Sequence, residues 1–330
     1  MKEVALSDIS NRILAFMKHI LITGGAGFIG SNLAFEIQSR YPDTRITVLD
    51  DFRSSSFKNL TGFRGDVLAY NVAERGWLSA VQSQPLDTLF HLASITDTTV
   101  LDEKKMMFDN VEGFRNILDL ACEKKSAVVY ASSAAVYGSQ ETPMKIKDGG
   151  RPNNIYGFSK WAMENLARTY TDKIKVVGLR YFNVFGPRES FKDKAASMIY
   201  QLYQQMLVGK RPRIFKYGEQ SRDFIYVKDV VEATLHARES MENGVFNVGT
   251  GQSTSFNDVI AALNEALETR YEPDYFDNPY DFYQNFTQAD MTETLKATGF
   301  KCRFTTREGI LDYVRGHLSP SSSYAPTSKS

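Results

Sequence analysis

The chain has 330 residues, a length that allows one large domain or two closely joined domains. Hydrophobic residues make up 42% and charged residues 24% of it, as in an ordinary soluble globular protein. Because Lys+Arg and Asp+Glu both number 39, the formal net charge of zero gives no electrostatic reason to expect a nucleic-acid or membrane partner. Two cysteines are too few for a disulfide framework, and four scattered histidines argue against a metal site.

The two ends of the sequence bear on localisation. Residues 1–17 contain Glu3 and Asp8 and lack the continuous apolar core of a signal peptide, so we interpret them as an N-terminal extension. No stretch approaches the roughly 18 apolar residues that a transmembrane helix needs. Residues 319–330 are of low complexity and are expected to be disordered. These features lead us to expect a cytoplasmic protein.

Strand-like and helix-like runs alternate from His19 onward. Short apolar runs typical of buried strands occupy 19–25, 45–51, 87–93, 126–133 and 175–182. Runs with helical periodicity lie between them at 28–41, 106–125 and 156–170. This alternation predicts βαβ units and an α/β Rossmann fold with a doubly wound, mostly parallel sheet.

The alternation breaks after Phe182, which predicts a second, smaller domain. We assign 18–182 to an NAD(P)-binding Rossmann domain, to which a strand–helix–strand passage within 221–250 is expected to return. Residues 183–220, with a helix near 195–208, and residues 251–318 then form a discontinuous C-terminal substrate domain.

A glycine-rich turn, TGGAGFIG, joins the first predicted strand to the first predicted helix. At this spacing Gly24 makes the tight turn, Gly27 lets the backbone approach a pyrophosphate, and Gly30 allows close helix–strand packing. The pyrophosphate would lie at the helix N-terminus, near Phe28 and Ile29, where N–H groups and the helix dipole favour an anion. The alternative is a glycine-rich turn that binds no ligand.

An acidic residue after the second strand supports the dinucleotide interpretation. Asp50 lies 20 residues after Gly30, where its carboxylate could accept ribose hydroxyls. Asp50, with Asp51 beside it, favours NAD, because a carboxylate repels a 2′-phosphate. Arg53 and the serines at 54–56 could instead bind that phosphate. The residues alone leave NAD and NADP open.

Three further residues indicate hydride-transfer chemistry. Tyr156 and Lys160 are four residues apart at the start of a predicted helix, so they share one face. Ser133 ends a predicted strand, which in a parallel sheet points to the cofactor crevice. A tyrosine with an ordinary pKa near 10 is a poor base at neutral pH, and a lysine cation beside it favours the phenolate. An ordinary amphipathic helix pair is the alternative interpretation of Tyr156 and Lys160.

Together the segments TGGAGFIG, SSAAVYG, YGFSK, RYFNVFGPRES and RDFIYVKDV resemble the extended short-chain dehydrogenase/reductase superfamily over residues 18–318. The segments at 182–197, 215–224 and 282–291, the last with the motif FTQAD, resemble the ADP-L-glycero-D-manno-heptose 6-epimerase family most. This resemblance implies oxidation at C6″ of an ADP-linked heptose for lipopolysaccharide core synthesis, followed by hydride return to the opposite face. It also implies NADP as the cofactor, with NAD as the alternative.

The resemblance carries over roles for individual residues. It makes Tyr156 one acid/base group and Lys192 a second one, although a solvated loop lysine is the alternative for Lys192. The implied cofactor contacts also include Leu92, Ala93, Ser94 and Asn110. The implied substrate contacts are Ser133, Asn183, Val184, Lys194, Gln201, Phe215, Arg222 and Tyr283. Lys194 and Gln201 depart from some members of the family, which leaves the sugar and its nucleotide open.

Other functions remain as alternatives. A UDP- or GDP-sugar 4-epimerase or 4-dehydrogenase of the same superfamily would not need Lys192. A dehydratase is disfavoured because Ala134 and Ala135 stand where an acidic pair is usual. A non-catalytic NAD(P)-binding module would typically lack the tyrosine or the lysine. The expected partner is a nucleotide-diphosphate sugar, and the expected assembly is a homo-oligomer.

Overall fold

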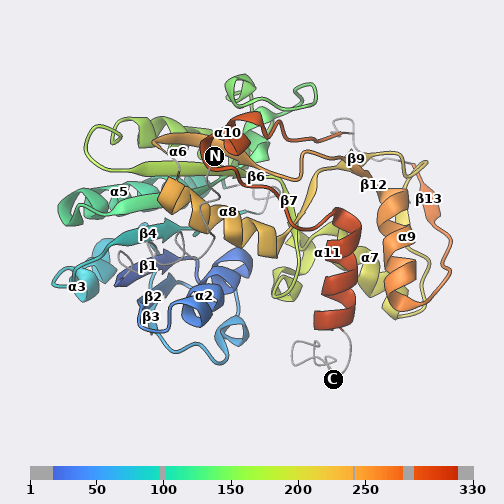
Figure 1. Ribbon diagram of the computed structural model, residues 1–330, viewed down its shortest axis with the longest axis horizontal. Coiled ribbons are helices and arrows are strands. Elements are labelled where there is room, and N and C mark those ends of the chain that lie inside the picture. The colour runs from blue at the N-terminus through green and yellow to red at the C-terminus, as the bar shows by residue number, and fades with distance from the viewer. Residues whose placement is uncertain (1–17, 97–101, 241, 278–285, 319–330) are drawn as a thin grey trace, which may run out of the picture.

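The computed structural model describes residues 18–96, 102–240, 242–277 and 286–318. Its central feature is a seven-stranded sheet with the order β11-β6-β5-β4-β1-β2-β3, in which every neighbouring pair is parallel (Figure 1). The strands are β1 (His19–Thr23), β2 (Arg45–Asp50), β3 (Asp66–Ala69), β4 (Thr88–His91), β5 (Ala127–Ser133), β6 (Val176–Tyr181) and β11 (Gly244–Val248). The predicted doubly wound Rossmann fold is confirmed.

Helices cover both faces of this sheet. Ile20 and Ile22 of β1 pack with α2 (Phe28–Arg40) and α8 (Val227–Ser240), while Leu21 packs on the other face with α5 (Gly113–Lys124) and α6 (Ile155–Arg168). Because neither face meets water, successive residues of the strands are apolar, which produced the continuous apolar runs in the sequence. β3 was not predicted, since most of its residues are exposed at the sheet edge.

Short helical segments fill the connections of this layer. They are η1 (Phe57–Leu60), η2 (Arg75–Trp77), α3 (Leu78–Val81), α4 (Glu103–Met107), the π-helical turn η3 (Phe108–Glu112), η4 (Ala134–Tyr137) and η5 (Ile146–Asp148). The segments α4, η3 and α5 follow one another without a break, and α6 packs against α4 and η3.

A second region, on the right of Figure 1, has its own apolar cluster built around α7 (Met198–Leu207), α9 (Phe256–Leu267) and α11 (Thr306–Tyr313). Its strands form three pairs, which are β7 (Asn183–Phe185) with β10 (Phe224–Tyr226), β9 (Ser221–Arg222) with β12 (Thr254–Ser255), and β8 (Arg213–Phe215) with β13 (Asp274–Phe276). The remaining segments of this region are η6 (Ser190–Ala195) and η7 (Val314–Leu318), while α10 (Thr292–Thr298) packs against β11 and α8 of the central layer. The strand β11 returns the chain to the central sheet, and the proposed domain boundaries remain a prediction.

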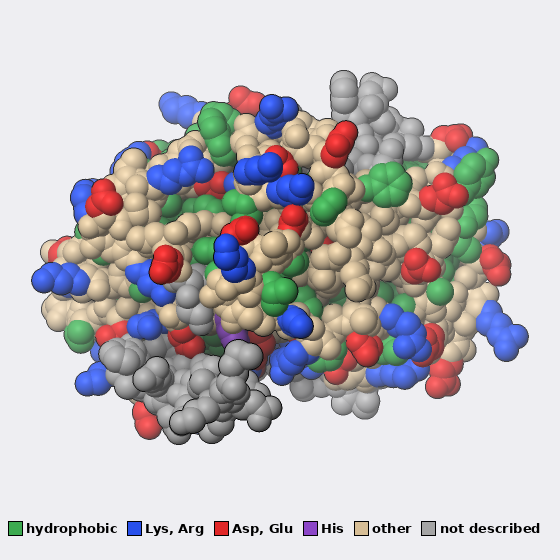
Figure 2. All heavy atoms as spheres, turned by 45° about the horizontal axis from the view of Figure 1, so that its top comes forward, with side chains coloured by type: hydrophobic (Ala, Val, Ile, Leu, Met, Phe, Trp, Pro, Cys, Tyr) green, Lys and Arg blue, Asp and Glu red, His purple; other side chains and the backbone are tan. Residues whose placement is uncertain are grey.

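The surface carries both signs of charge. Basic and acidic side chains are interspersed over the face shown in Figure 2, in keeping with the zero net charge. Of the helices that the structure describes, none combines the length and the apolar character needed to cross a membrane.

Candidate active site

A cleft of about 480 Å³ lies where the chain reverses its direction of progress across the sheet, between β1 and β4. The carboxyl ends of five strands line it, through Gly24 after β1, Asp50 of β2, Leu92 after β4, Ser133 of β5 and Tyr181 of β6. In an open parallel sheet this switch point is where a ligand binds. The predicted residues lining the cleft are Gly24, Gly27, Phe28, Ile29, Gly30, Asp50, Asp51, Arg53, Leu92, Ala93, Ser94, Asn110, Ser133, Tyr156, Lys160, Asn183, Val184, Lys192 and Arg222.

The glycine turn after β1 leaves room at the start of α2. Gly24 has a φ of +69°, and its N–H donates to the Leu49 carbonyl at 2.8 Å. A Cβ on Gly30 would lie 2.1 Å from the Gly24 carbonyl oxygen, so only glycine allows the helix to approach so closely. A Cβ on Gly27 would meet only that oxygen, at 3.1 Å, and would extend into the cleft. Within the described residues no side chain caps α2, so its first N–H groups fit a pyrophosphate.

Asp50 holds the same turn from the end of β2. Its carboxylate accepts hydrogen bonds from the Ala26 N–H at 3.0 Å, the Phe52 N–H at 2.9 Å and the Ser55 hydroxyl at 2.8 Å. Burial raises the pKa of Asp50, and these hydrogen bonds to the carboxylate oppose the rise. Asp50 therefore holds the glycine turn in place. It also lines the cleft, where it was predicted to accept hydrogen bonds from the cofactor ribose.

The Arg53 guanidinium, predicted to bind a 2′-phosphate, lies between two carboxylates. Its Nε donates to Asp51 at 2.5 Å, and Nη1 donates to Asp109. Asp51, which favours NAD, and Arg53, which was expected to bind the 2′-phosphate of NADP, are therefore paired with each other at the cleft.

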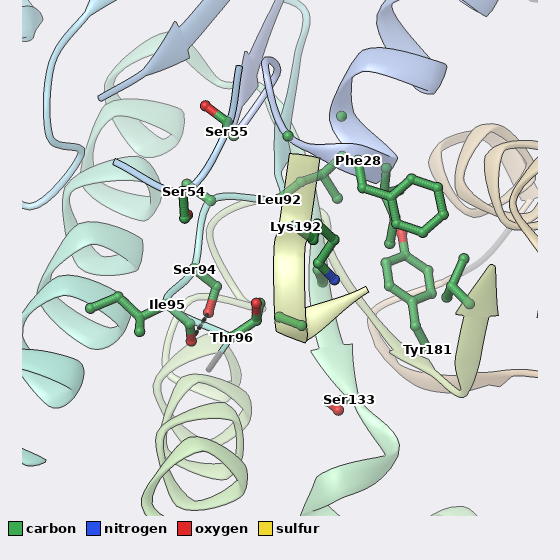
Figure 3. Close-up of a pocket in the computed structure, with 18 of the residues that line it drawn as sticks. Phe28, Ser54, Ser55, Leu92, Ser94, Ile95, Thr96, Ser133, Tyr181 and Lys192 are labelled. Atoms are coloured by element: carbon green, nitrogen blue, oxygen red, sulfur yellow. Dashed lines mark hydrogen bonds between the residues drawn. The ribbon is translucent and has the colours of Figure 1, made fainter. Parts of the chain in front are cut away.

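The strand β5 and the helix α6 bring Ser133, Tyr156 and Lys160 to one place. Tyr156 and Lys160 are one helical turn apart, and the Lys160 Nζ lies 5.8 Å from the centroid of the Tyr156 ring. The buried Lys160 Nζ donates to the Ala131 carbonyl of β5 at 2.8 Å. Ser133 ends the same strand two residues later. Figure 3 shows where Ser133 lies in the cleft.

Neighbouring polar groups fix the start of α6. The Asn154 side chain accepts from the Gly157 N–H at 2.8 Å and thereby caps the helix. The fully buried Asn110 donates to the Ser159 hydroxyl at 2.9 Å and accepts from the Ile95 N–H at 2.8 Å. Asn110, itself a predicted cofactor contact, thus links α6 to the loop after β4.

Burial dominates the protonation of these groups. It raises the pKa of the Tyr156 phenol, and hydrogen bonding with Ser133 opposes part of this rise. It lowers the pKa of Lys160 to about 7, although attraction to Glu164 acts in the other direction. The phenol is therefore protonated near neutral pH while Lys160 is close to its titration point, so burial acts against the activation expected from the sequence.

Lys192 enters the cleft from the second region, on η6. Its Nζ lies 5.7 Å from the centroid of the Phe28 ring, and Figure 3 shows the side chain directed into the cleft. Burial lowers the pKa of Lys192, and the Glu189 carboxylate raises it in part. Glu189 is fully buried and accepts from the Gly186 N–H at 3.0 Å and the Ser197 N–H at 2.6 Å, which closes the loop carrying Lys192.

Three predicted substrate residues line the cleft from the short strands. Asn183 and Val184 belong to β7, and the Asn183 side chain accepts from the Thr287 hydroxyl at 3.2 Å. Arg222 belongs to β9, and its Nη1 donates to the Ser221 carbonyl at 3.0 Å.

The other predicted substrate residues are placed differently. Among the described residues, the cleft lining does not include Gln201 or Phe215. The Gln201 amide donates to the Ala196 carbonyl at 2.8 Å, and Phe215 packs edge-on against a ring of β13. Tyr283 and the side chain of Lys194 lie outside the described residues. Their roles stay predictions.

The sequence analysis missed polar groups that hold the cleft in shape. The fully buried Glu164 pairs with Arg180 at 2.7 Å and accepts from the Ser132 hydroxyl at 2.6 Å. In the sequence, only its position one helical turn after Lys160 indicated that Glu164 could lie near the active site. Asp109 at the other end of the cleft pairs with Lys105 one turn before it, but its partners Arg53 and Asn71 come from separate elements, which no local pattern places beside it.

Across 18–96, 102–240, 242–277 and 286–318, no three His, Cys, Asp or Glu side chains are grouped to hold a metal ion. His91 lies near the cleft, but burial lowers its pKa to about 3 and its ring stacks on Phe114. His91 is therefore a neutral core residue.

Comparison with known proteins identifies relatives with the same fold. The model of the NAD dependent epimerase/dehydratase family matches residues 20–249. The structure of ADP-L-glycero-D-manno-heptose-6-epimerase from Helicobacter pylori is 40% identical, with a TM-score of 0.85 over 91% of this chain and 96% of that chain.

Two 4-epimerases are more distant. UDP-glucose 4-epimerase from Thermotoga maritima, solved with UDP-glucose, is 27% identical with a TM-score of 0.82, and the match covers 90% of this chain and 97% of that chain. UDP-glucose 4-epimerase from Thermus thermophilus, solved with NAD, is 26% identical with a TM-score of 0.79 and the same coverage.

Proposed function

The chain belongs to the NAD dependent epimerase/dehydratase family and is a nucleotide-sugar epimerase, and we propose that it is an ADP-glycero-manno-heptose 6-epimerase. The observation that carries the proposal is that Lys192 shares one cleft with Ser133, Tyr156 and Lys160. Inversion at C6″ requires proton transfer to or from the C6″ oxygen with the sugar presented by either face. Two acid/base groups from different elements are suited to this. The 40% identity to the Helicobacter pylori enzyme supports the same reaction.

Ser133, Tyr156 and Lys192 have separate roles in the proposed reaction. Ser133 hydrogen-bonds the substrate oxygen, and Tyr156 and Lys192 move its proton in the two half-reactions. Because burial lowers the pKa of Lys192, its neutral amine is more accessible as a base than that of an exposed lysine. When bound in this cleft, NAD(P) would supply the hydride acceptor and donor, which makes the whole cycle redox-neutral.

The cofactor we infer is NADP, with NAD as the alternative. Arg53, Ser54 and Ser55 line the cleft and support binding of a 2′-phosphate. Asp50 supports NAD, and the solved NAD complex of the Thermus thermophilus relative agrees with that alternative. Arg222 is suited to the sugar-nucleotide diphosphate, because a guanidinium can donate two parallel hydrogen bonds. A cytoplasmic homo-oligomer acting in lipopolysaccharide core synthesis completes the proposal.

Lys192→Met tests the proposal, because it keeps the length of the side chain and removes the proton-transfer group. We expect interconversion of the two C6″ epimers of ADP-heptose, followed by NMR, to fall at least about 100-fold. Calorimetric affinity for ADP-heptose should change little. Lys210→Met is the matched control, since Lys210 is exposed and outside the cleft lining. Normal epimerisation by Lys192→Met would overturn the two-base proposal.

A 4-epimerase is the second candidate, supported by the similarity to the two UDP-glucose 4-epimerases. A panel of ADP-, GDP- and UDP-sugars incubated with the wild type separates the two. Faster inversion at C4″ of a UDP-hexose than at C6″ of ADP-heptose would replace the 6-epimerase assignment.

A further inference from the structure

The end of the cleft next to β2 carries an excess of negative charge. Among the described residues, Arg53 and Lys105 are the cations paired with carboxylates here, and Asp50, Asp51 and Asp109 are the carboxylates. These five described residues carry a formal charge of −1 together. A 2′-phosphate would add further negative charge there, whereas the ribose hydroxyl of NAD would add none.

Asp109 is the most buried member of this cluster among the residues whose ion pairs are described. Its side chain is 5% exposed, and it accepts from Asn71 at 3.0 Å, from Lys105 at 3.0 Å and from Arg53. Burial alone would raise the pKa of Asp109, but these hydrogen bonds hold it below its ordinary value. Asp109 is therefore ionised at neutral pH and faces Arg53 as a carboxylate.

The Arg53 guanidinium already uses each of its nitrogens. Nε and Nη2 contact Asp51, and Nη1 contacts Asp109. To bind a 2′-phosphate bidentately, Arg53 must leave or share one of these partners. The Asp51 side chain is 26% exposed, so water screens that pair more than the pair with Asp109.

We propose that Asp109 limits the preference of this enzyme for NADP over NAD, by competing with the 2′-phosphate of NADP for the Arg53 guanidinium. The competition weakens NADP and leaves NAD unaffected, because the uncharged ribose hydroxyl does not require Arg53. Asp109 is thus a specificity residue supplied by η3, between α4 and α5, far along the chain from Asp50 and Asp51 at the end of β2.

Asp109→Asn tests this proposal by removing the charge while keeping the size. Calorimetry with NAD and NADP, on protein stripped of co-purified nucleotide, should show NADP affinity rising about tenfold relative to NAD, the effect of one partly buried ion pair. Adenosine 2′,5′-bisphosphate and 5′-AMP, which carry only the adenosine half, should show the same difference. Glu112→Gln is the matched control, since it removes one acidic charge that pairs with Arg115 outside the cleft lining.

Two further variants keep the proposal falsifiable if Asp109→Asn does not fold. Arg53→Ala should weaken NADP far more than NAD. Adding Asp109→Asn to Arg53→Ala should change the ratio of the NADP and NAD affinities less than Asp109→Asn changes it in the wild type. Lys105→Met frees Asp109 from a competing cation, so it should weaken NADP more than Lys104→Met does. Equal changes for both cofactors in these variants would overturn the proposal. No sugar substrate enters the titrations, so the inference fails separately from the 6-epimerase assignment, although it depends on NAD(P) binding.

Discussion

The two walls of the cleft are held in place in different ways. The sheet wall consists of Ser133, Tyr156 and Lys160, each placed by the end of a strand or the face of a helix. The loop wall is the segment 186–197 with Lys192, which is closed by one buried carboxylate, Glu189. Loss of the Tyr156 hydroxyl from the sheet wall should therefore affect chemistry alone, whereas loss of Glu189 should displace the whole loop.

The largest expected effect comes from Tyr156→Phe, which removes one hydroxyl from the sheet wall. Turnover should fall by a factor of about 10²–10⁴, the usual contribution of a positioned acid/base group. The affinity for the sugar nucleotide and the free energy of unfolding should change little, because regular elements hold the ring. NMR of the epimer mixture and urea denaturation measure these quantities. Tyr170→Phe, outside the cleft lining, is the control, and near-normal turnover of Tyr156→Phe would place the base elsewhere.

Glu189→Gln tests the loop wall and should affect stability and turnover together. Each carboxylate oxygen of Glu189 accepts from one backbone N–H, and the amide NH₂ of glutamine replaces one of these acceptors with a donor. The free energy of unfolding should therefore fall by about 1–3 kcal/mol. Displacement of Lys192 should lower turnover about tenfold, while the affinity for the dinucleotide persists. Urea denaturation, the NMR assay and calorimetry separate the three effects.

A double variant distinguishes positioning from simple destabilisation. Once Lys192→Met has removed the base, adding Glu189→Gln should cost little further turnover, although the stability loss should remain. Glu219→Gln removes an exposed charge and serves as the control. Fully additive losses of turnover would show that Glu189 does not act through Lys192.

The smallest expected effect concerns the pH dependence of stability at Lys160. Its pKa in the folded chain is about 7 and its ordinary value is 10.5, so between these values the unfolded chain binds more protons. The free energy of unfolding contributed by this group therefore rises with pH through that window, and burial costs most below pH 7. Lys160→Met should be more stable than the wild type at pH 6 by at least about 1 kcal/mol. The difference should shrink toward pH 10, as thermal unfolding at several pH values would measure, and a constant difference would contradict it.

The contrast between the central sheet and the second region also separates the elements that the sequence predicted from those that it did not. Five strands of the central sheet and three of its helices were readable from the sequence, because each buries a continuous or periodic apolar pattern of its own. These are β1, β2, β4, β5 and β6, with α2, α5 and α6. The edge strand β3 and the two- and three-residue strands of the second region were not, because so few residues carry no period. Their strand geometry depends on the partner they meet.

By itself the sequence determined the parallel sheet, the glycine turn and the Tyr156–Lys160 pair, because each is encoded by residues close together in the chain. Only the tertiary structure decided that Arg53 faces Asp109 and that Glu189 closes the Lys192 loop. It also turned Gln201 and Phe215 to contacts outside the described cleft lining. These outcomes follow from how separate elements pack, since a buried charge or amide takes the partner that packing brings within hydrogen-bond distance.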